Sequence, residues 1–123
     1  MNEEVRDLIG SEPLLGVTGR DVGNGQLVAL ALVFGADALH CRCNDATDEI
    51  VIEVVSADSL DYPPLHNETL QRAIGMVLEY AWDLTNHRGY ADAFQLRFAD
   101  SRGQEEMCQF EVAACTIDIY RVL

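Results

Sequence analysis

Residues 27–34 read LVALALVF, an apolar run without a polar side chain. A run of this length is typical of a β-strand, and apolar residues on both of its faces indicate that both faces are covered, by the chain itself or at an interface. The turn at residues 35–37 follows, and residues 44–48 form a second turn cluster between expected strands at residues 38–43 and 49–55. Short turns between consecutive strands predict an antiparallel meander.

Residues 76–84 fit two interpretations, because their apolar side chains match both a helical and an alternating pattern. We favour a strand for two reasons. Gly75 can end a preceding helix in the left-handed conformation. Residues 94–98 alternate apolar and polar side chains and supply a matching partner strand.

These two strands predict a hairpin with a defined register. A three-residue loop at residues 87–89 ends in Gly89, and loops of this length prefer glycine in that left-handed position. The register places Trp82 opposite Phe94 on a buried, aromatic-rich face. We therefore expect Trp82 to be buried, and Trp82→Ala to lower the free energy of unfolding by roughly 3–5 kcal/mol.

The remaining segments complete the expected fold. Alternation predicts two more strands, at residues 107–112 and 116–122. Local patterns predict a short helix at residues 2–9, a second short helix after an N-cap at Asn67, and a glycine-rich loop at residues 16–25. The sequence thus predicts one α+β domain over residues 1–123. Its main feature is an antiparallel sheet of about seven strands, accompanied by a short N-terminal helix and a short central helix.

The composition is strongly acidic. Twenty-one acidic residues outnumber eight basic ones, all of them arginine, and give a formal net charge of -13. Such a charge repels nucleic acid phosphates and anionic membranes, so we expect no direct binding to either, whereas a basic protein is a suitable partner. The sequence has no apolar run long enough to span a membrane and no secretory signal pattern, which favours a cytoplasmic location.

Four cysteines are present, at positions 41, 43, 108 and 115. Cys41 and Cys43 share one face of an expected strand and His40 points to the other, an arrangement unlike the Cys-x-x-Cys spacing of zinc sites. Buried free thiols in a reducing compartment are the expected state. We expect no metal and no other cofactor, and therefore no stoichiometric zinc in the purified protein.

The sequence shows no catalytic motif. A Gly-x-Ser-x-Gly stretch is absent, and the glycines of residues 16–25 lack the spacing of phosphate-binding and dinucleotide-binding loops. Polar residues around the predicted hairpin and on the neighbouring strand form the candidate binding surface: Glu79, Asp83, Tyr90, Asp92, Arg97 and Glu111.

The second half of the chain carries a resemblance. WDLTN at residues 82–86, GYAD at residues 89–92 and QLRF at residues 95–98 follow a short expected helix. Over residues 66–123 this pattern resembles a family of small bacterial proteins known only as a domain of unknown function, which implies an α+β fold and no known activity. In size and acidity the chain also resembles immunity proteins and phage-encoded inhibitors.

These observations favour a non-catalytic, acidic protein-binding module of the immunity or inhibitor type, which engages a basic partner. One alternative is a nucleic-acid mimic that inhibits a DNA- or RNA-binding protein, which needs carboxylates arrayed in rows. Another is a small enzyme or ligand-binding protein with a pocket near Trp82 and Tyr90. We also expect a homodimer, because one apolar face of residues 27–34 needs cover and twofold pairing is the commonest solution.

Overall fold

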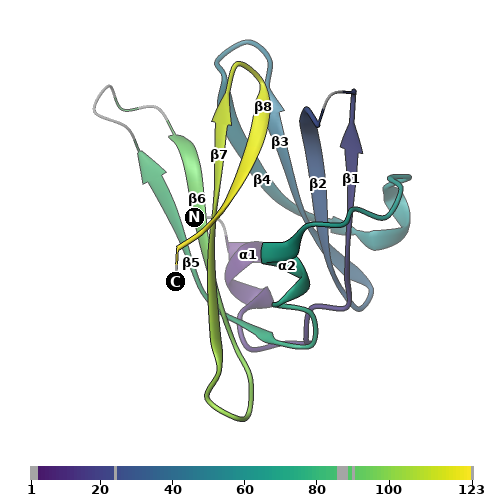
Figure 1. Ribbon diagram of the computed structural model, residues 1–123, viewed down its shortest axis with the longest axis vertical. Coiled ribbons are helices and arrows are strands. Elements are labelled where there is room, and N and C mark those ends of the chain that lie inside the picture. The colour runs from purple at the N-terminus through teal and green to yellow at the C-terminus, as the bar shows by residue number, and fades with distance from the viewer. Residues whose placement is uncertain (1–2, 24, 86–88, 90, 123) are drawn as a thin grey trace.

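Two four-stranded antiparallel sheets pack face to face in the computed structural model, which describes residues 3–23, 25–85, 89 and 91–122 (Figure 1). The first sheet consists of β1 (Gly16–Asp21), β2 (Leu27–Phe34), β3 (Asp37–Asn44) and β4 (Glu49–Ser56). The second consists of β5 (Val77–Thr85), β6 (Ala91–Ala99), β7 (Glu105–Ala113) and β8 (Thr116–Arg121). Each sheet is a meander in which neighbours in sequence are neighbours in space, as predicted for β2, β3 and β4.

The described residues form eight strands rather than about seven, because part of the glycine-rich segment is a strand. In β1, Val17 is buried, and the backbone of Gly19 lies close to Ala29 of β2 and to the Leu65 side chain. A Cβ atom at Gly19 would lie 3.1 Å from the carbonyl oxygen of Ala29 in β2 and 3.1 Å from the Leu65 side chain. The glycine that suggested a loop is therefore the residue that lets β1 lie close to its neighbours.

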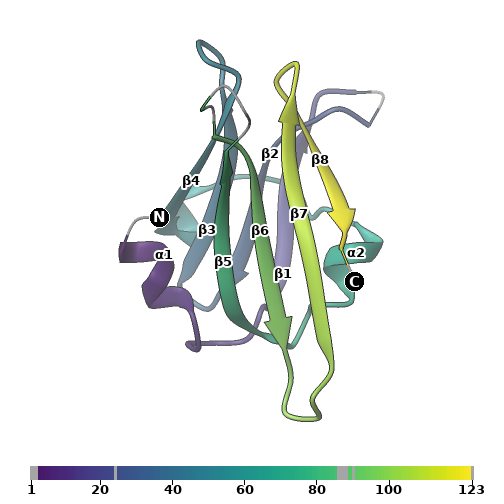
Figure 2. The same cartoon turned by 90° about the vertical axis from the view of Figure 1, so that its left-hand side faces the viewer.

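The helices are short and lie at the edges of the sandwich (Figure 2). Helix α1 (Glu3–Leu8) buries Val5 and Leu8 and packs against β4 and β5. Helix α2 (Glu68–Gln71) begins after Asn67, whose side-chain oxygen accepts a hydrogen bond from the Leu70 backbone N–H at 3.1 Å, which confirms the predicted N-cap. Among the described residues, no helix is long and apolar enough to cross a membrane.

Alternating side chains of both sheets fill the space between them. Strands β2, β3, β5, β6 and β7 contribute eight of the largest fully buried side chains: Leu30, Leu32, Leu39, Leu78, Phe94, Leu96, Phe98 and Phe110. Leu14 and Leu70, from outside the strands, join them. Phe34 and Phe98 stack across the interface with ring centroids 6.4 Å apart. This single core holds the two sheets together.

The second apolar face of β2 is covered by the chain itself. Residues 57–66, which include the 3₁₀ turn η1 (Ala57–Ser59), run along the side of the first sheet that faces away from the second sheet (Figure 1). This segment is attached to β1, since the Gly19 N–H donates to the Pro63 carbonyl at 3.0 Å. Ala31 is only 1% exposed and lies opposite His40, whose ring contacts Tyr62 of this segment. β2 therefore needs no second chain to cover it, and the homodimer stays a prediction.

Residues 77–85 form a strand, as predicted, but the register of the β5–β6 hairpin is not the predicted one. Leu78 lies opposite Phe98, as the predicted loop requires. The register then shifts by one residue at Glu79 and shifts back between Leu84 and Thr85. Gly89 has the expected left-handed φ of 85°, whereas residues 86–88 of the expected loop region lie outside the described residues.

Between the two shifts, each side chain of β5 points to the face of the sheet opposite to the predicted one. Trp82 lies opposite Gln95 instead of Phe94 and is 38% exposed, while Ala81 takes the inward position. A one-residue slip moves a side chain to the other face of a sheet, and β-bulges are the usual means of producing one. The prediction that Trp82 is buried against Phe94 is therefore wrong, because the predicted register allowed for no bulge.

We predict that Phe98→Ala lowers the free energy of unfolding by roughly 3–5 kcal/mol, because it empties the centre of the core. Trp82→Ala should lower the free energy of unfolding by only about 1–2 kcal/mol, because it removes the ring contact with Tyr80 and a partly buried apolar area. Urea denaturation followed by circular dichroism would measure both values. Equal losses for the two variants would contradict the outward placement of Trp82.

Candidate functional site

Aromatic and charged side chains gather on the outer face of the second sheet. We call this surface the aromatic–acidic face and define it by its outward residues on β5 to β8: Tyr80, Trp82, Arg97, Glu111, Asp118 and Tyr120. The register forms a row across all four strands, in which Trp82 pairs with Gln95, Gln95 with Gln109, and Gln109 with Tyr120. Residues directly opposite one another share a face of the sheet, so two aromatic rings border two amides.

Three large aromatic side chains on this face are in contact with solvent. Tyr80 is 50% exposed, Trp82 38% and Tyr120 48%. The Tyr80 and Trp82 rings stack with centroids 5.6 Å apart, although they belong to the same strand. Exposed aromatic rings of this size are typical of surfaces that bind partners, because they bury much apolar area with little loss of side-chain freedom.

One guanidinium is already held on this face. The Arg97 guanidinium carbon lies 5.8 Å from the centroid of the Tyr80 ring. Carboxylates flank it, since Arg97 Nε lies 3.5 Å from Glu79 Oε1 and its terminal nitrogen donates to Glu105. A ring beneath and carboxylates beside the cation form a cradle suited to arginine.

The other end of the face also has an aromatic ring beside two carboxylates, but no cation is held there by the residues that the structure describes. Glu111 and Asp118 lie directly opposite each other on β7 and β8, and like charges in this position repel. Within the described part of the chain, neither carboxylate has an ion-pair partner. Asp118, followed by burial and Glu111, raises the pKa of the Tyr120 phenol. Gln109 links the two ends, accepting from Gln95 at 2.6 Å and donating to Glu111 at 2.5 Å.

The structure brings together three of the six residues proposed from the sequence. Arg97 and Glu111 belong to the aromatic–acidic face, and the Glu79 carboxylate lies beside it, 3.5 Å from Arg97 Nε. Asp83 is exposed but pairs with Phe94, which places it on the opposite side of the sheet from Trp82. The remaining two are separate cases: Asp92 is a half-buried residue at the second register shift, and Tyr90 lies outside the described residues.

Four members of the face were missing from the residues proposed from the sequence: Tyr80, Trp82, Asp118 and Tyr120. The alternation of Ile117 and Ile119 in β8 was the available signal for Asp118 and Tyr120, because it turns the residues between and after them outward. Tyr80 and Trp82 had no comparable signal, since their outward placement depends on the register shifts.

A second polar group lies beneath the segment 57–66. His40 is 6% exposed, and its two ring nitrogens contact Glu53 Oε1 at 2.9 Å and the Tyr62 hydroxyl at 2.8 Å. Arg42 Nε lies 3.6 Å from the same Glu53 oxygen. The imidazole is buried and both of its nitrogens are engaged, so this group holds the covering segment against the first sheet rather than exposing a catalytic base.

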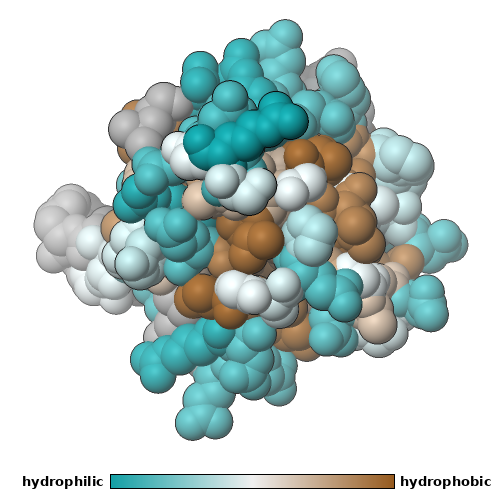
Figure 3. All heavy atoms as spheres, turned by 90° about the horizontal axis from the view of Figure 1, so that it is seen from below, coloured by the Kyte–Doolittle hydropathy of each residue, from teal (hydrophilic) through white to brown (hydrophobic). Residues whose placement is uncertain are grey.

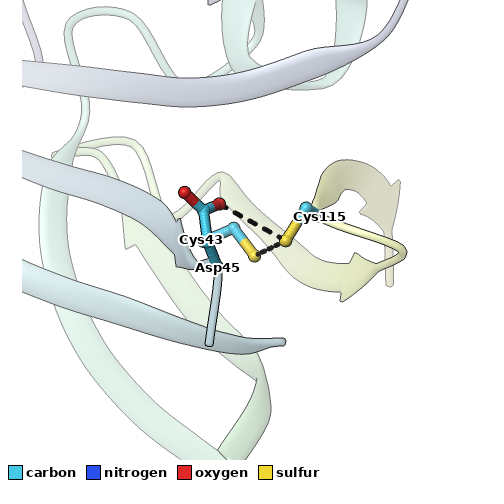
Figure 4. A group of neighbouring side chains, drawn as sticks. All are labelled: Cys43, Asp45 and Cys115. Atoms are coloured by element: carbon cyan, nitrogen blue, oxygen red, sulfur yellow. Dashed lines mark hydrogen bonds between the residues drawn. The ribbon is translucent and has the colours of Figure 1, made fainter. Parts of the chain in front are cut away.

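Two cysteines from different sheets meet at one end of the sandwich (Figure 4). Cys43 lies in β3 and Cys115 in the β7–β8 turn, and their sulfur atoms are 2.6 Å apart. Asp45 Oδ1 lies 3.6 Å from the Cys115 sulfur, and thiolates with a carboxylate are ligands that zinc accepts. Two thiolates on one tetrahedral zinc lie about 3.8 Å apart, so the present geometry does not fit a shared ion.

The lower end of the molecule carries a shallow cavity. Apolar surface gathers in the middle of this end and hydrophilic residues surround it (Figure 3). A cavity of about 570 Å³ is lined by residues from the end of α1, the start of β5 and the end of β6, among them Ile9, Pro13, Val77, Glu79 and Asp100. Its two carboxylates and Ser101 stand among apolar residues and glycines, and the described residues of the lining include no histidine, cysteine or arginine.

Comparisons with known proteins place the chain in a family. The sequence model of a family described as a family of unknown function, DUF6334, matches residues 1–123, and the chain belongs to this family. The likeness therefore covers both halves of the chain, whereas the sequence pattern located it in residues 66–123. No curated protein and no solved structure shows a significant similarity to the chain.

We predict a pH-dependent contribution from Glu53. Its hydrogen bond with His40 lowers its pKa against the opposing effect of burial, so its contribution to stability is present above the ordinary value of 4.5 and is lost as pH falls through the lowered value. Glu53→Gln should lower the free energy of unfolding at pH 7, and the difference in this free energy between the variant and wild type should become smaller towards pH 3. Urea denaturation at several pH values would test this, with the exposed Asp58→Asn as control. A difference independent of pH would contradict it.

Proposed function

We propose that this member of the DUF6334 family is a non-catalytic protein-binding module, and that its aromatic–acidic face binds an arginine-containing segment of a basic protein. The observation that carries the proposal is the contrast between the two ends of this face. At one end, Arg97 lies over Tyr80 between Glu79 and Glu105. At the other, Tyr120 stands beside Glu111 and Asp118, and no arginine of the described residues pairs with them.

A guanidinium from a partner suits the second end for electrostatic reasons. Glu111 and Asp118 repel each other across the strand pair, and a cation between them removes this repulsion. The flat guanidinium can also stack on the Tyr120 ring while donating to both carboxylates, which a lysine ammonium cannot do in the same geometry. The chemistry of the site therefore favours arginine over lysine.

The rest of the face supports a protein ligand rather than a single side chain. Trp82, with Tyr80 stacked against it, presents apolar area at the other end of the row, and the amides of Gln95 and Gln109 lie between Trp82 and Tyr120. An extended peptide can place an arginine at Tyr120 and an apolar residue at Trp82. The net charge of -13 attracts basic partners from a distance and accelerates their association.

We predict that the double variant Glu111→Gln/Asp118→Asn binds a hexa-arginine peptide about tenfold or more weakly than wild type, because it removes both carboxylates of the proposed cradle. The matched control is Asp58→Asn/Asp61→Asn, which changes the net charge equally at exposed positions of the segment that covers the first sheet. The control should change the dissociation constant less than about twofold. Isothermal titration calorimetry at two salt concentrations would measure these constants.

Two results would contradict the proposal. Equal weakening in both double variants would mean that the peptide responds to net charge alone. Equal affinity for hexa-arginine and hexa-lysine in the wild-type protein would remove the argument from the guanidinium. Backbone amide shifts in an NMR titration would locate the peptide independently, and we expect them on β7 and β8 around Tyr120.

A further inference from the structure

We propose that Cys43 and Cys115 form an oxidation site, in which hydroperoxides convert the two thiols into a disulfide that joins the two sheets. The inference is independent of the proposed binding function. It depends on the contact between the two sulfur atoms, which come from segments 72 residues apart in sequence. All four cysteines are free thiols in the structure, so the inference concerns what this pair becomes on oxidation.

The positions of the two sulfur atoms already suit a covalent bond. Their separation of 2.6 Å exceeds the disulfide bond length of about 2.05 Å by only about half an ångström. The β7–β8 turn that carries Cys115 is held in place, because Asp48 accepts hydrogen bonds from the backbone N–H of Ala114 at 3.2 Å and of Cys115 at 2.8 Å. The pair therefore needs little movement to react.

The turn itself has an unusual backbone. Ala114 and Cys115 both have positive φ values, of 50° and 59°, in a two-residue connection that normally contains asparagine or glycine. The Asp48 carboxylate comes from the β3–β4 turn of the other sheet and stabilises this conformation. The two hairpin turns thus hold Cys115 directly against Cys43.

The two thiols differ in access and in ease of ionisation. Burial, followed by the hydrogen bond to Cys115, raises the pKa of Cys43 to about 12. Accepting that hydrogen bond lowers the pKa of Cys115, although burial and the Asp45 and Asp48 carboxylates leave it raised overall. Cys115 is also partly exposed, whereas Cys43 is buried. Cys115 is therefore the thiol that meets the oxidant first, and Cys43 is the one that completes the bond.

The chemistry balances with hydrogen peroxide as the oxidant. The Cys115 thiolate attacks one peroxide oxygen, an S–O bond forms, the O–O bond breaks, and water leaves after proton transfer. Cys43, deprotonated as it reacts, then attacks the sulfenic acid sulfur, so that the S–S bond forms, the S–O bond breaks and a second water leaves. The two thiols lose two electrons and two protons, and the peroxide is reduced to two waters.

The other two cysteines provide an internal comparison. Cys41 and Cys108 lie in the core between the sheets, and burial raises the pKa of both thiols. Buried thiols with little thiolate react slowly with peroxide. Oxidation should therefore be confined to the Cys43–Cys115 pair.

The test uses the full chain with hydrogen peroxide as the probe. Oxidised protein should lose two hydrogen atoms, about 2 Da, and proteolysis without reductant should yield a single linked peptide pair containing Cys43 and Cys115. The melting temperature should rise by roughly 10 °C or more relative to protein kept in dithiothreitol, because the bond closes a long loop. Cys115→Ala should abolish both effects, and Cys108→Ala is the matched control that should retain them.

A second measurement does not depend on any variant folding. Alkylation of wild-type protein after peroxide treatment and unfolding should modify only Cys41 and Cys108, and all four cysteines after dithiothreitol. Four alkylated cysteines after peroxide treatment would overturn the proposal.

Purified protein with one zinc per chain that is lost in both Cys43→Ala and Cys115→Ala would also overturn it, since the pair would then serve as metal ligands.

Discussion

Burial of two apolar sheet faces against each other is the constraint on which the other features of this molecule depend. Phe94, Phe98 and Phe110 of the second sheet occupy the space opposite the leucines of the first, and protein interiors have little spare volume. The small Ala81 takes the inward position opposite Leu96 and belongs to this core. The register shifts at both ends of this part of β5 place it there, and the aromatic–acidic face is their result on the outer side.

Alternation and turn residues were sufficient to predict much of the fold. The run at residues 27–34 and the turns after it predicted the β2–β3–β4 meander, and Asn67 was identified as an N-cap from its residue type alone. β1 was missed because glycine normally weakens a strand, and its benefit at Gly19 depends on how close Ala29 and Leu65 come in three dimensions. A contact of that kind has no signature in the local sequence.

In the candidate site too, local patterns predicted some residues, and others depended on three-dimensional packing. Alternation assigned Arg97 and Glu111 to faces of their strands even though the predicted register was slightly wrong, and Glu79 forms an ion pair with Arg97. Trp82 was placed on the wrong face because a bulge depends on which side chain fits the core, and hairpin rules based on loop length do not include that choice. Cys43 and Cys115 belong to different sheets, so their contact follows from packing and not from cysteine spacing.

The order of the strands has a consequence for how the chain folds. Each sheet is continuous in sequence, over residues 16–56 and 77–121, so most strand pairings join neighbouring segments and require closure of short loops only. During synthesis, the first sheet and the segment that covers its outer face emerge before any strand of the second. The nascent chain can thus complete one layer with one protected side, while the other apolar side remains open until the second layer leaves the ribosome.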